Sequence, residues 1–321
     1  MSEGWRNYKL GGLLFEPTTP VGPVAEVVRD GALPAKVDLR GMCSPVENQL
    51  QVGSCAANAA VGALEFHQRR ANMPQVDLSR LFVYYNARRM AGKENEDCGT
   101  MMSHVMASVM AFGACEEKLW PYIESRWPEA PPTECYDNAL RYEAVVYARV
   151  PLGEACLQMV ASGLPVVFGT SLPSEYYRSA AETGVTPAPG EDAPPPGGGH
   201  AMLIVGYDMN EETWLVRNSW GAEFADGGYF RIPFKTLQKY SHPDFFWIFG
   251  AIEQTTGGAV RLSGPNMRAT IEQTRAAAPQ QAEDAIARLK KGLRTKLNQD
   301  LETAKEALRR RLRGPGNGGG Y

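Results

Sequence analysis

The chain has 321 residues, 33 Lys and Arg against 36 Asp and Glu, and a formal net charge of -3. This near balance gives no sign of a protein that binds polyanions over its whole surface. Apolar residues make up 44% of the chain and charged residues 21%, which excludes wholesale disorder. No apolar run approaches the ~20 residues of a membrane-spanning helix, and the pattern of a cleaved secretory signal is missing. We therefore expect a soluble globular protein, either cytoplasmic or exported without such a signal.

The composition divides the chain into five segments. Residues 1–36 are rich in Pro and Gly and have no strong period, which predicts an extended leader. Residues 37–253 hold all six cysteines and most of the aromatic residues, and they form the expected packed body. Residues 254–265 resemble a linker. Residues 266–313 change to a helical pattern, and the Gly-rich tail 314–321 is expected to be flexible.

The body changes from helical patterns to strand patterns along its length. The predicted helices are 56–70, 78–90 and 101–112, and the predicted strands are 165–169, 202–207, 213–216 and 229–232. Helices first and strands later indicate an α+β fold with two lobes and a cleft between them.

Cys55 differs from the other five cysteines because it stands where the first predicted helix begins. The partial positive charge of a helix N-terminus lowers the pKa of a thiol and favours the reactive thiolate. The alternative is a cysteine that only packs at a helix start, as buried cysteines often do. Paired CxxC spacings are absent, so we expect no structural metal and no cofactor.

A reactive cysteine needs a base, and His200 is the candidate among four histidines. His67 shares the helix of Cys55 but lies about 18 Å along it. His104 falls in a helical pattern and His242 in a polar loop. In contrast, His200 follows three glycines and opens a strand, where a slim backbone presents its ring. The alternative is a hydrogen-bonded structural histidine.

Asn218 is the expected partner of His200. A turn near residues 209–211 predicts a hairpin, and pairing across it brings His200 opposite the segment that contains Asn218 and Trp220. The amide of Asn218 can orient the imidazole, and Trp220 can shield the hydrogen bond from water. Asp208 lies at the far end of the strand, about 25 Å away. Nucleophile, base and orienting residue are thus all available.

The order Gln49, Cys55, His200, Asn218 resembles the papain-like cysteine peptidases. The surrounding sequences are Gly-Ser-Cys, Gly-His-Ala and Asn-Ser-Trp-Gly, and 145 residues separate the cysteine from the histidine. The resemblance covers residues 37–253 and identifies the chain as a divergent, bacterial-type member. It implies a two-lobed papain-like fold, with a helical lobe and an antiparallel β lobe.

The resemblance also implies roles for these residues. Cys55 would be the nucleophile, His200 its general base and acid, and Asn218 the residue that orients His200. The side chain of Gln49 and the backbone N–H of Cys55 would form the oxyanion hole. The expected activity is thiol-dependent hydrolysis of peptide bonds in proteins or peptides, by an endopeptidase made as a zymogen. Two alternatives stay open: an acyl transferase or ligase of the same fold, and a non-catalytic scaffold acting through its C-terminal helix.

Three residues would contact the substrate if the resemblance holds. Gly99 would lie on the backbone edge that holds an extended peptide, and Ala201 would line the main specificity pocket. Trp220 would form part of the wall next to the catalytic residues.

The resemblance suggests disulfides as well. The family has a cysteine three residues before the nucleophile, where this chain has Val52. Cys98 matches the family's later cysteine, so we expect Cys43 as its substitute partner. The remaining expected pair is Cys115 with Cys135.

The two ends of the chain lie outside the resemblance. The leader 1–36 is expected to run along the cleft and restrict access, or else to be a structural strap. Residues 266–313 carry twelve Lys or Arg and six Asp or Glu, and their apolar positions recur about every 3.7 residues. This predicts a basic amphipathic helix that binds a protein partner or a second copy, or packs on its own body. Aromatic residues for stacking are absent from it, which disfavours specific nucleic-acid binding.

Overall fold

The computed structural model describes residues 8–16, 24–25, 32–242, 245–254 and 258–261. The chain divides into two compact units, Met1–Thr274 and Arg275–Tyr321, and every described residue belongs to the first. The predicted arm 266–313 and tail 314–321 lie outside the described residues.

Helices dominate the first half of the described body and strands the second half, as the patterns predict, but further short helices lie between the strands. The α-helices of the described part are α1 (Cys55–Arg70), α2 (Arg80–Met90), α3 (Met102–Phe112), α4 (Thr133–Ala139), α5 (Glu154–Ala161), α6 (Ser174–Thr183) and α7 (Phe234–Tyr240). The strands are β1 (Leu13–Leu14), β2 (Lys36–Asp38), β3 (Thr100–Met101), β4 (Tyr142–Arg149), β5 (Val166–Thr170), β6 (His200–Asp208), β7 (Thr213–Arg217), β8 (Tyr229–Pro233), β9 (Phe246–Gln254) and β10 (Gly258–Arg261). The three predicted helices and four predicted strands are confirmed within about two residues at each end.

One antiparallel sheet forms the second lobe. Its main path is β10-β9-β5-β6-β7-β8, with β2 paired to β6 and β4 paired to β9. The predicted hairpin is β6–β7, in which Asp208 pairs with Thr213 and Leu203 with Arg217. The chain therefore has the expected α+β architecture of two lobes.

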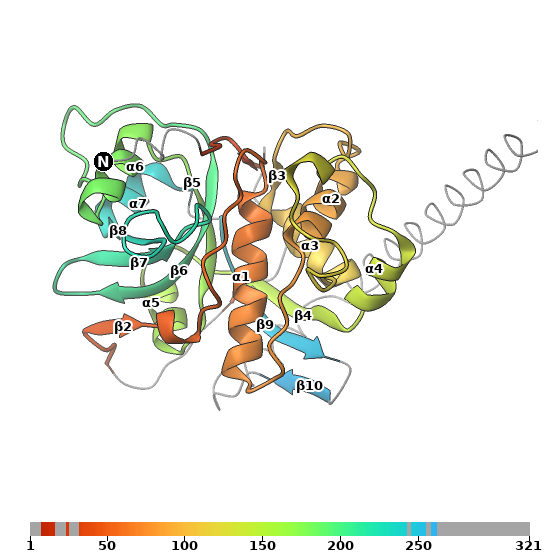
Figure 1. Ribbon diagram of the computed structural model, residues 1–321. Helices are drawn as coiled ribbons and strands as arrows, with labels where there is room; N and C mark the ends of the chain where they lie inside the picture. The colour runs from red at the N-terminus through yellow and green to blue at the C-terminus, as the bar shows by residue number, and fades with distance from the viewer. Residues whose placement is uncertain (1–7, 17–23, 26–31, 243–244, 255–257, 262–321) are drawn as a thin grey trace, which may run out of the picture. The chain divides into compact units, whose positions relative to one another are not determined.

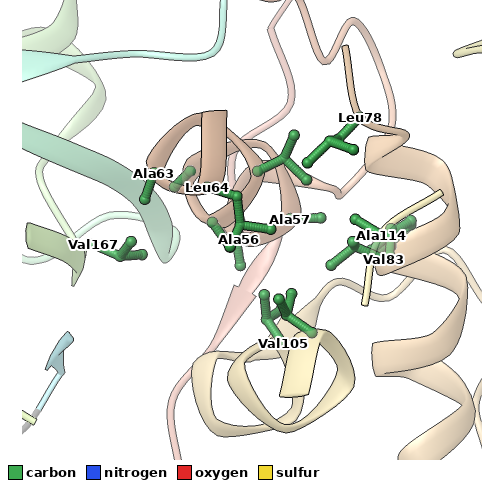
Figure 2. Close-up of a cluster of buried hydrophobic side chains, with 14 of the residues drawn as sticks. Ala56, Ala57, Ala63, Leu64, Leu78, Val83, Val105, Ala114 and Val167 are labelled. Carbon is green, nitrogen blue, oxygen red and sulfur yellow. The ribbon is translucent and has the colours of Figure 1, made fainter. Parts of the chain in front are cut away.

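The helix α1 lies between the helices α2 and α3 and the sheet (Figure 1). A helix with neighbours on both sides is apolar around most of its circumference, and α1 meets this need with small alanines. Figure 2 shows Ala57 directed toward Val83 and Ala114 on the helical side, whereas Ala63 lies toward Val167 of β5. Both lobes thus pack on the helix that begins at Cys55.

The predicted linker 254–265 is wrong in part. Residues Gly258–Arg261 form β10, which pairs with Ala251–Gln254 of β9. This short strand, Gly-Ala-Val-Arg, extends the edge of the sheet beyond the expected end of the body at residue 253.

Candidate active site

Cys55 is the first residue of α1 and is fully buried. Burial raises the pKa of its thiol to about 11, although hydrogen bonds from the backbone of Ala201 and Ala56 favour the ionised form. Ala201 directly follows His200 in β6. The contact with Ala201 therefore brings the start of α1 next to the start of β6. The predicted nucleophile and the predicted base stand at these two element ends.

His200 bonds to Asn218 as the hairpin predicts. Its Nε2 lies 2.9 Å from Oδ1 of Asn218. Because an amide oxygen only accepts, Nε2 carries the proton, and Nδ1 is left as the basic nitrogen. Nδ1 is buried and has no hydrogen-bond partner. The imidazole is thus held in the tautomer that can accept a proton from a thiol.

Aromatic rings enclose this pair. Trp220 stacks on His200 with ring centroids 4.9 Å apart, and Tyr177 of α6 packs edge-on at 5.7 Å. Burial lowers the pKa of His200 to about 4, and the hydrogen bond with Asn218 partly offsets this effect. Burial therefore favours the neutral thiol of Cys55 and the neutral imidazole of His200. The motifs singled out Trp220, but nothing in the sequence around Tyr177 marks it as part of the site.

Gln49 is buried, and its amide is held in one orientation. The hydroxyl of Ser219 donates to Oε1 at 2.6 Å, which leaves Nε2 as the donor. Nε2 reaches the carbonyl of Val52 at 3.1 Å and that of Lys9 at 3.4 Å. A second contact, from the backbone N–H of Gln49 to the carbonyl of Ser219 at 2.8 Å, fixes the same two segments together. Ser219 was visible in the sequence as part of Asn-Ser-Trp-Gly, but its bond to Gln49 was not predicted.

The leader residues 8–14 pass directly through this site. Gly11 and Leu13 both donate backbone hydrogen bonds to the carbonyl of Gly199, at 3.0 and 3.2 Å, and the N–H of Thr100 donates to the carbonyl of Gly12 at 3.1 Å. The strand β1 then pairs in parallel with β3. In Figure 1 the dark red trace of these residues crosses near the N-terminal end of α1, beside β3. The leader is therefore bonded to both walls next to the predicted catalytic residues.

Glycines make this close approach feasible. A side chain on Gly12 would collide with the backbone of Gly53, and one on Gly99 or Gly199 would collide with the leader backbone. Gly99 also has φ +79°, a conformation that favours glycine. We call the space between Gly53, Gly99 and Gly199 that holds the leader residues 8–14 the channel. The predicted substrate-contact residue Gly99 thus borders this channel.

Ala201 and Trp220 border the same channel at two other points. Ala201 is fully buried and pairs with Gly169 across β5 and β6, and the side chain of Leu13 lies against Gly169. Tyr8 stacks on Trp220 with centroids 4.9 Å apart and planes 5° apart. Leu13 and Tyr8 therefore mark two positions at which leader side chains contact the walls of the site.

The predicted disulfides are not formed, since all six cysteines are free thiols. Cys43 lies beside the carbonyl of Leu39, and Cys98 beside that of Gly99 at the leader. The structure therefore has no bond between Cys43 and Cys98. Cys115 and Cys135 do meet, but as hydrogen-bonded thiols. Burial raises the pKa of both thiols.

The described residues include no group of three or more His, Cys, Asp or Glu side chains that could hold a metal ion. Nor does this part of the chain contain a helix that is long and apolar enough to span a membrane.

Known proteins are similar to this chain in sequence and in fold. Residues 33–241 match the papain family of cysteine proteases. An uncharacterized peptidase C1-like protein of Acanthamoeba polyphaga mimivirus is 31% identical over 234 residues, which cover 68% of this chain and 73% of that protein. A cathepsin L-like peptidase of Aedes aegypti is 32% identical over 234 residues, 69% of this chain and 64% of its own length.

A solved structure extends the likeness to the fold. The structure of xylellain, a cysteine protease from Xylella fastidiosa, is 29% identical with a TM-score of 0.64, covering 78% of this chain and 98% of that chain. The digestive procathepsin L 3 of Tenebrio molitor is 18% identical with a TM-score of 0.54, covering 76% of both chains, and shares the fold.

Proposed function

Because the chain belongs to the papain family of cysteine proteases, a family of thiol-dependent peptide hydrolases, we propose that Cys55 and His200 are its catalytic pair. The observation that carries this assignment is the bond from His200 Nε2 to Asn218 Oδ1, which leaves Nδ1 basic and unpartnered beside the start of α1. Asn218 then acts as the orienting residue, and Gln49 as a donor to the oxyanion.

The reaction follows from these positions. Nδ1 of His200 takes the thiol proton, and Sγ of Cys55 attacks the carbonyl carbon of the peptide. Nε2 of Gln49 and the N–H of Cys55 stabilise the oxygen that becomes negative. His200 then gives its proton to the departing amine, which leaves an acyl group on Cys55. Finally, His200 removes a proton from water, and the resulting attack frees the acid and the thiol.

We also propose that the leader keeps the enzyme closed. Its contacts with Gly199, Thr100 and Gln49 occupy the positions where an extended substrate would bind. Gly99 and Ala201, which border this channel, would then contact substrate once the leader has moved. Cys55 and His200 are both fully buried, so burial favours the neutral thiol and the neutral imidazole over the charged pair. Opening the cleft would restore solvent and the reactive ion pair.

Turnover of fluorogenic peptide amides by four versions of the full chain tests the assignment. Cys55→Ala and His200→Ala should each lower kcat by about 10⁴-fold or more, and Asn218→Ala by less, because the first two remove reacting groups. Full activity in Cys55→Ala would refute the assignment.

The same assay distinguishes the two alternative functions. With a peptide amine added, an amide product in place of the acid would favour the acyl transferase alternative. A chain that neither hydrolyses peptides nor reacts with a thiol probe, even with the leader displaced, would favour the scaffold.

We further propose that the basic segment 266–313 binds a protein partner or a second copy of the chain. Its twelve basic and six acidic residues support this, and opposite charge on a partner would contribute to the binding. Reversing the charge of Arg309, Arg310 and Arg311 to Glu should lower the molar mass seen by light scattering if the segment joins two copies. The same molar mass for the variant and for the wild type would contradict self-association.

A further inference from the structure

Lys9 of the leader lies where the acyl side of a substrate would lie. Its carbonyl oxygen is 3.4 Å from Nε2 of Gln49, the donor proposed for the oxyanion. Tyr8, which precedes Lys9, stacks on Trp220, and Leu13, four residues after Lys9, lies against Gly169. The side chain of Lys9 therefore leaves the channel at the position of the residue whose carbonyl is attacked.

At that position the ammonium of Lys9 meets an acidic group. Nζ donates to Oδ2 of Asp97 in a short hydrogen bond and to the Asp97 carbonyl at 3.1 Å. Asp97 stands two residues before Gly99, on the loop that borders the channel. Its side chain is only 16% exposed, so a charge placed there is poorly screened by water.

The carboxylate of Asp97 is held in place by other groups. Its Oδ1 accepts hydrogen bonds from the N–H of Gly53 at 3.0 Å and from the hydroxyl of Tyr84 at 2.6 Å. Oδ1 is therefore used inside the protein, and Oδ2 is the atom that faces Lys9. Removing the leader would leave Oδ2 as an acceptor at the edge of the channel.

The surroundings of Asp97 favour its charged form. Burial acts to raise its pKa, but the hydrogen bonds from Lys9, Tyr84 and Gly53 outweigh burial and hold the pKa below its ordinary value. Arg88 of α2 carries a charge near Asp97. Its guanidinium donates hydrogen bonds to the carbonyls of Glu94, Glu96 and Trp127. The negative charge at the channel is therefore kept and is available to a cation.

We propose that Asp97 makes this cleft selective for peptide bonds that follow Lys or Arg, with Lys9 occupying the place of that basic residue. The inference rests on the proposed function, because it takes Gln49 as the oxyanion donor. A basic side chain would replace the Lys9 ammonium on Oδ2, whereas a neutral side chain would leave a poorly hydrated carboxylate unpaired.

Two peptide amides that differ only in Lys or Gln before the fluorogenic group test the proposal. The measured quantity is the ratio of their kcat/KM values on the full chain. Leader closure reduces the rates on both substrates equally, so the ratio reports the open site alone. A charged hydrogen bond of ordinary strength predicts a preference of about tenfold or more for Lys. A ratio near one in the wild type would overturn the proposal.

Asp97→Asn is the matched variant, since its Oδ1 can still accept from Gly53 and Tyr84 while the charge at Oδ2 is lost. It should bring the ratio to within about threefold of one. Lys9→Met leaves Asp97 intact and should raise both rates with the Lys preference unchanged. Circular dichroism will show whether Asp97→Asn folds. If it does not fold, Lys9→Met remains as the test, because it keeps Asp97 intact. Loss of the Lys preference in Lys9→Met would refute the role of Asp97.

Failure of this inference and failure of the proposed function look different. If Cys55→Ala abolishes hydrolysis of both peptides while the wild type cleaves them equally, the peptidase assignment stands and the selectivity is wrong. If Cys55→Ala retains activity, the proposed catalytic pair is wrong as well.

Discussion

Single hydrogen bonds decide how the catalytic side chains point. Gln49 could rotate its amide so that either the oxygen or the nitrogen faces the channel, and the hydroxyl of Ser219 selects the nitrogen by donating to Oε1. Asn218 plays the corresponding part for His200. In both cases a buried donor or acceptor would lose its partner if the orientation changed, which costs about 1–3 kcal/mol. The two residues after β7, Asn218 and Ser219, therefore hold the base and the oxyanion donor in position.

Ser219→Ala should lower kcat with little change in KM, because it frees the amide of Gln49 to rotate without removing it. We expect a loss of about tenfold, against about 10²–10³-fold for Gln49→Ala. Steady-state kinetics of the two single variants and the double variant measure the coupling. If Ser219 acts through Gln49, the double variant should be no worse than Gln49→Ala, and Ser219→Thr should restore most of the rate.

Strictly additive losses in that cycle would contradict the positioning role. They would mean that Ser219 supports the site in some other way, such as through the backbone contact from Gln49 to its carbonyl.

At the scale of elements, the leader and the walls of the cleft fit together through backbone atoms. Gly12 faces Gly53 and Gly99, and Leu13 faces Gly199. A side chain at Gly12 would meet the backbone of Gly53 at 2.8 Å, and a backbone cannot move aside as a flexible side chain can. The docking of the leader therefore depends on the absence of a Cβ atom at one position outside the catalytic machinery.

Gly12→Val should displace the leader and raise the peptidase activity of the full chain by about tenfold, since overpacking of this kind costs 1–3 kcal/mol. The same variant should expose Cys55, so that its thiol titrates below the pKa of about 11 that burial now imposes. Labelling with iodoacetamide at pH 7, read by mass spectrometry of peptides, should then become faster at Cys55. The other buried cysteines should stay unlabelled, because burial raises the pKa of Cys43, Cys115 and Cys156 as well.

Val24→Ala is the control for this experiment, because Val24 is 43% exposed and its backbone pairs with Arg149 at the end of β4. It should change neither activity nor labelling. Equal activity of Gly12→Val and wild type would show that the leader does not restrict access.

The elements also show which features the sequence could predict. The helix at 55–70 and the hairpin that joins His200 to Asn218 follow from local periodicity and turn residues, and both are confirmed. The course of residues 8–14 was not predictable in detail, because its partners are distant in the sequence, from Gln49 to Gly199, and glycines carry no periodic signal. The strand β10 was not predicted for a different reason: its partner β9 is adjacent in the chain, but the Gly-rich segment 254–265 has the composition of a linker. No motif in the sequence marks Asp97, since its significance depends on the contact with Lys9.

At the scale of the whole molecule, both lobes share α1, so a charge forced into its interior affects them together. His67 lies near the end of α1 that is opposite to Cys55 and is fully buried. Burial, helped by the positive charge of Arg70, lowers its pKa from 6.5 to about 3. The folded protein therefore keeps His67 neutral under conditions in which the unfolded chain protonates it.

The sign of the resulting pH dependence is fixed by this difference. Below pH 6.5 the unfolded chain binds a proton that folded His67 refuses, so the free energy of unfolding falls as the pH falls, until about pH 3. Between pH 7 and pH 5 the loss from this one group is about 2 kcal/mol. His67→Phe removes the titrating group and keeps an aromatic ring of similar shape beside Phe66. Urea unfolding at both pH values should therefore show that the variant loses about 2 kcal/mol less stability than the wild type, whereas equal losses in the two chains would mean that His67 is protonated in the folded state.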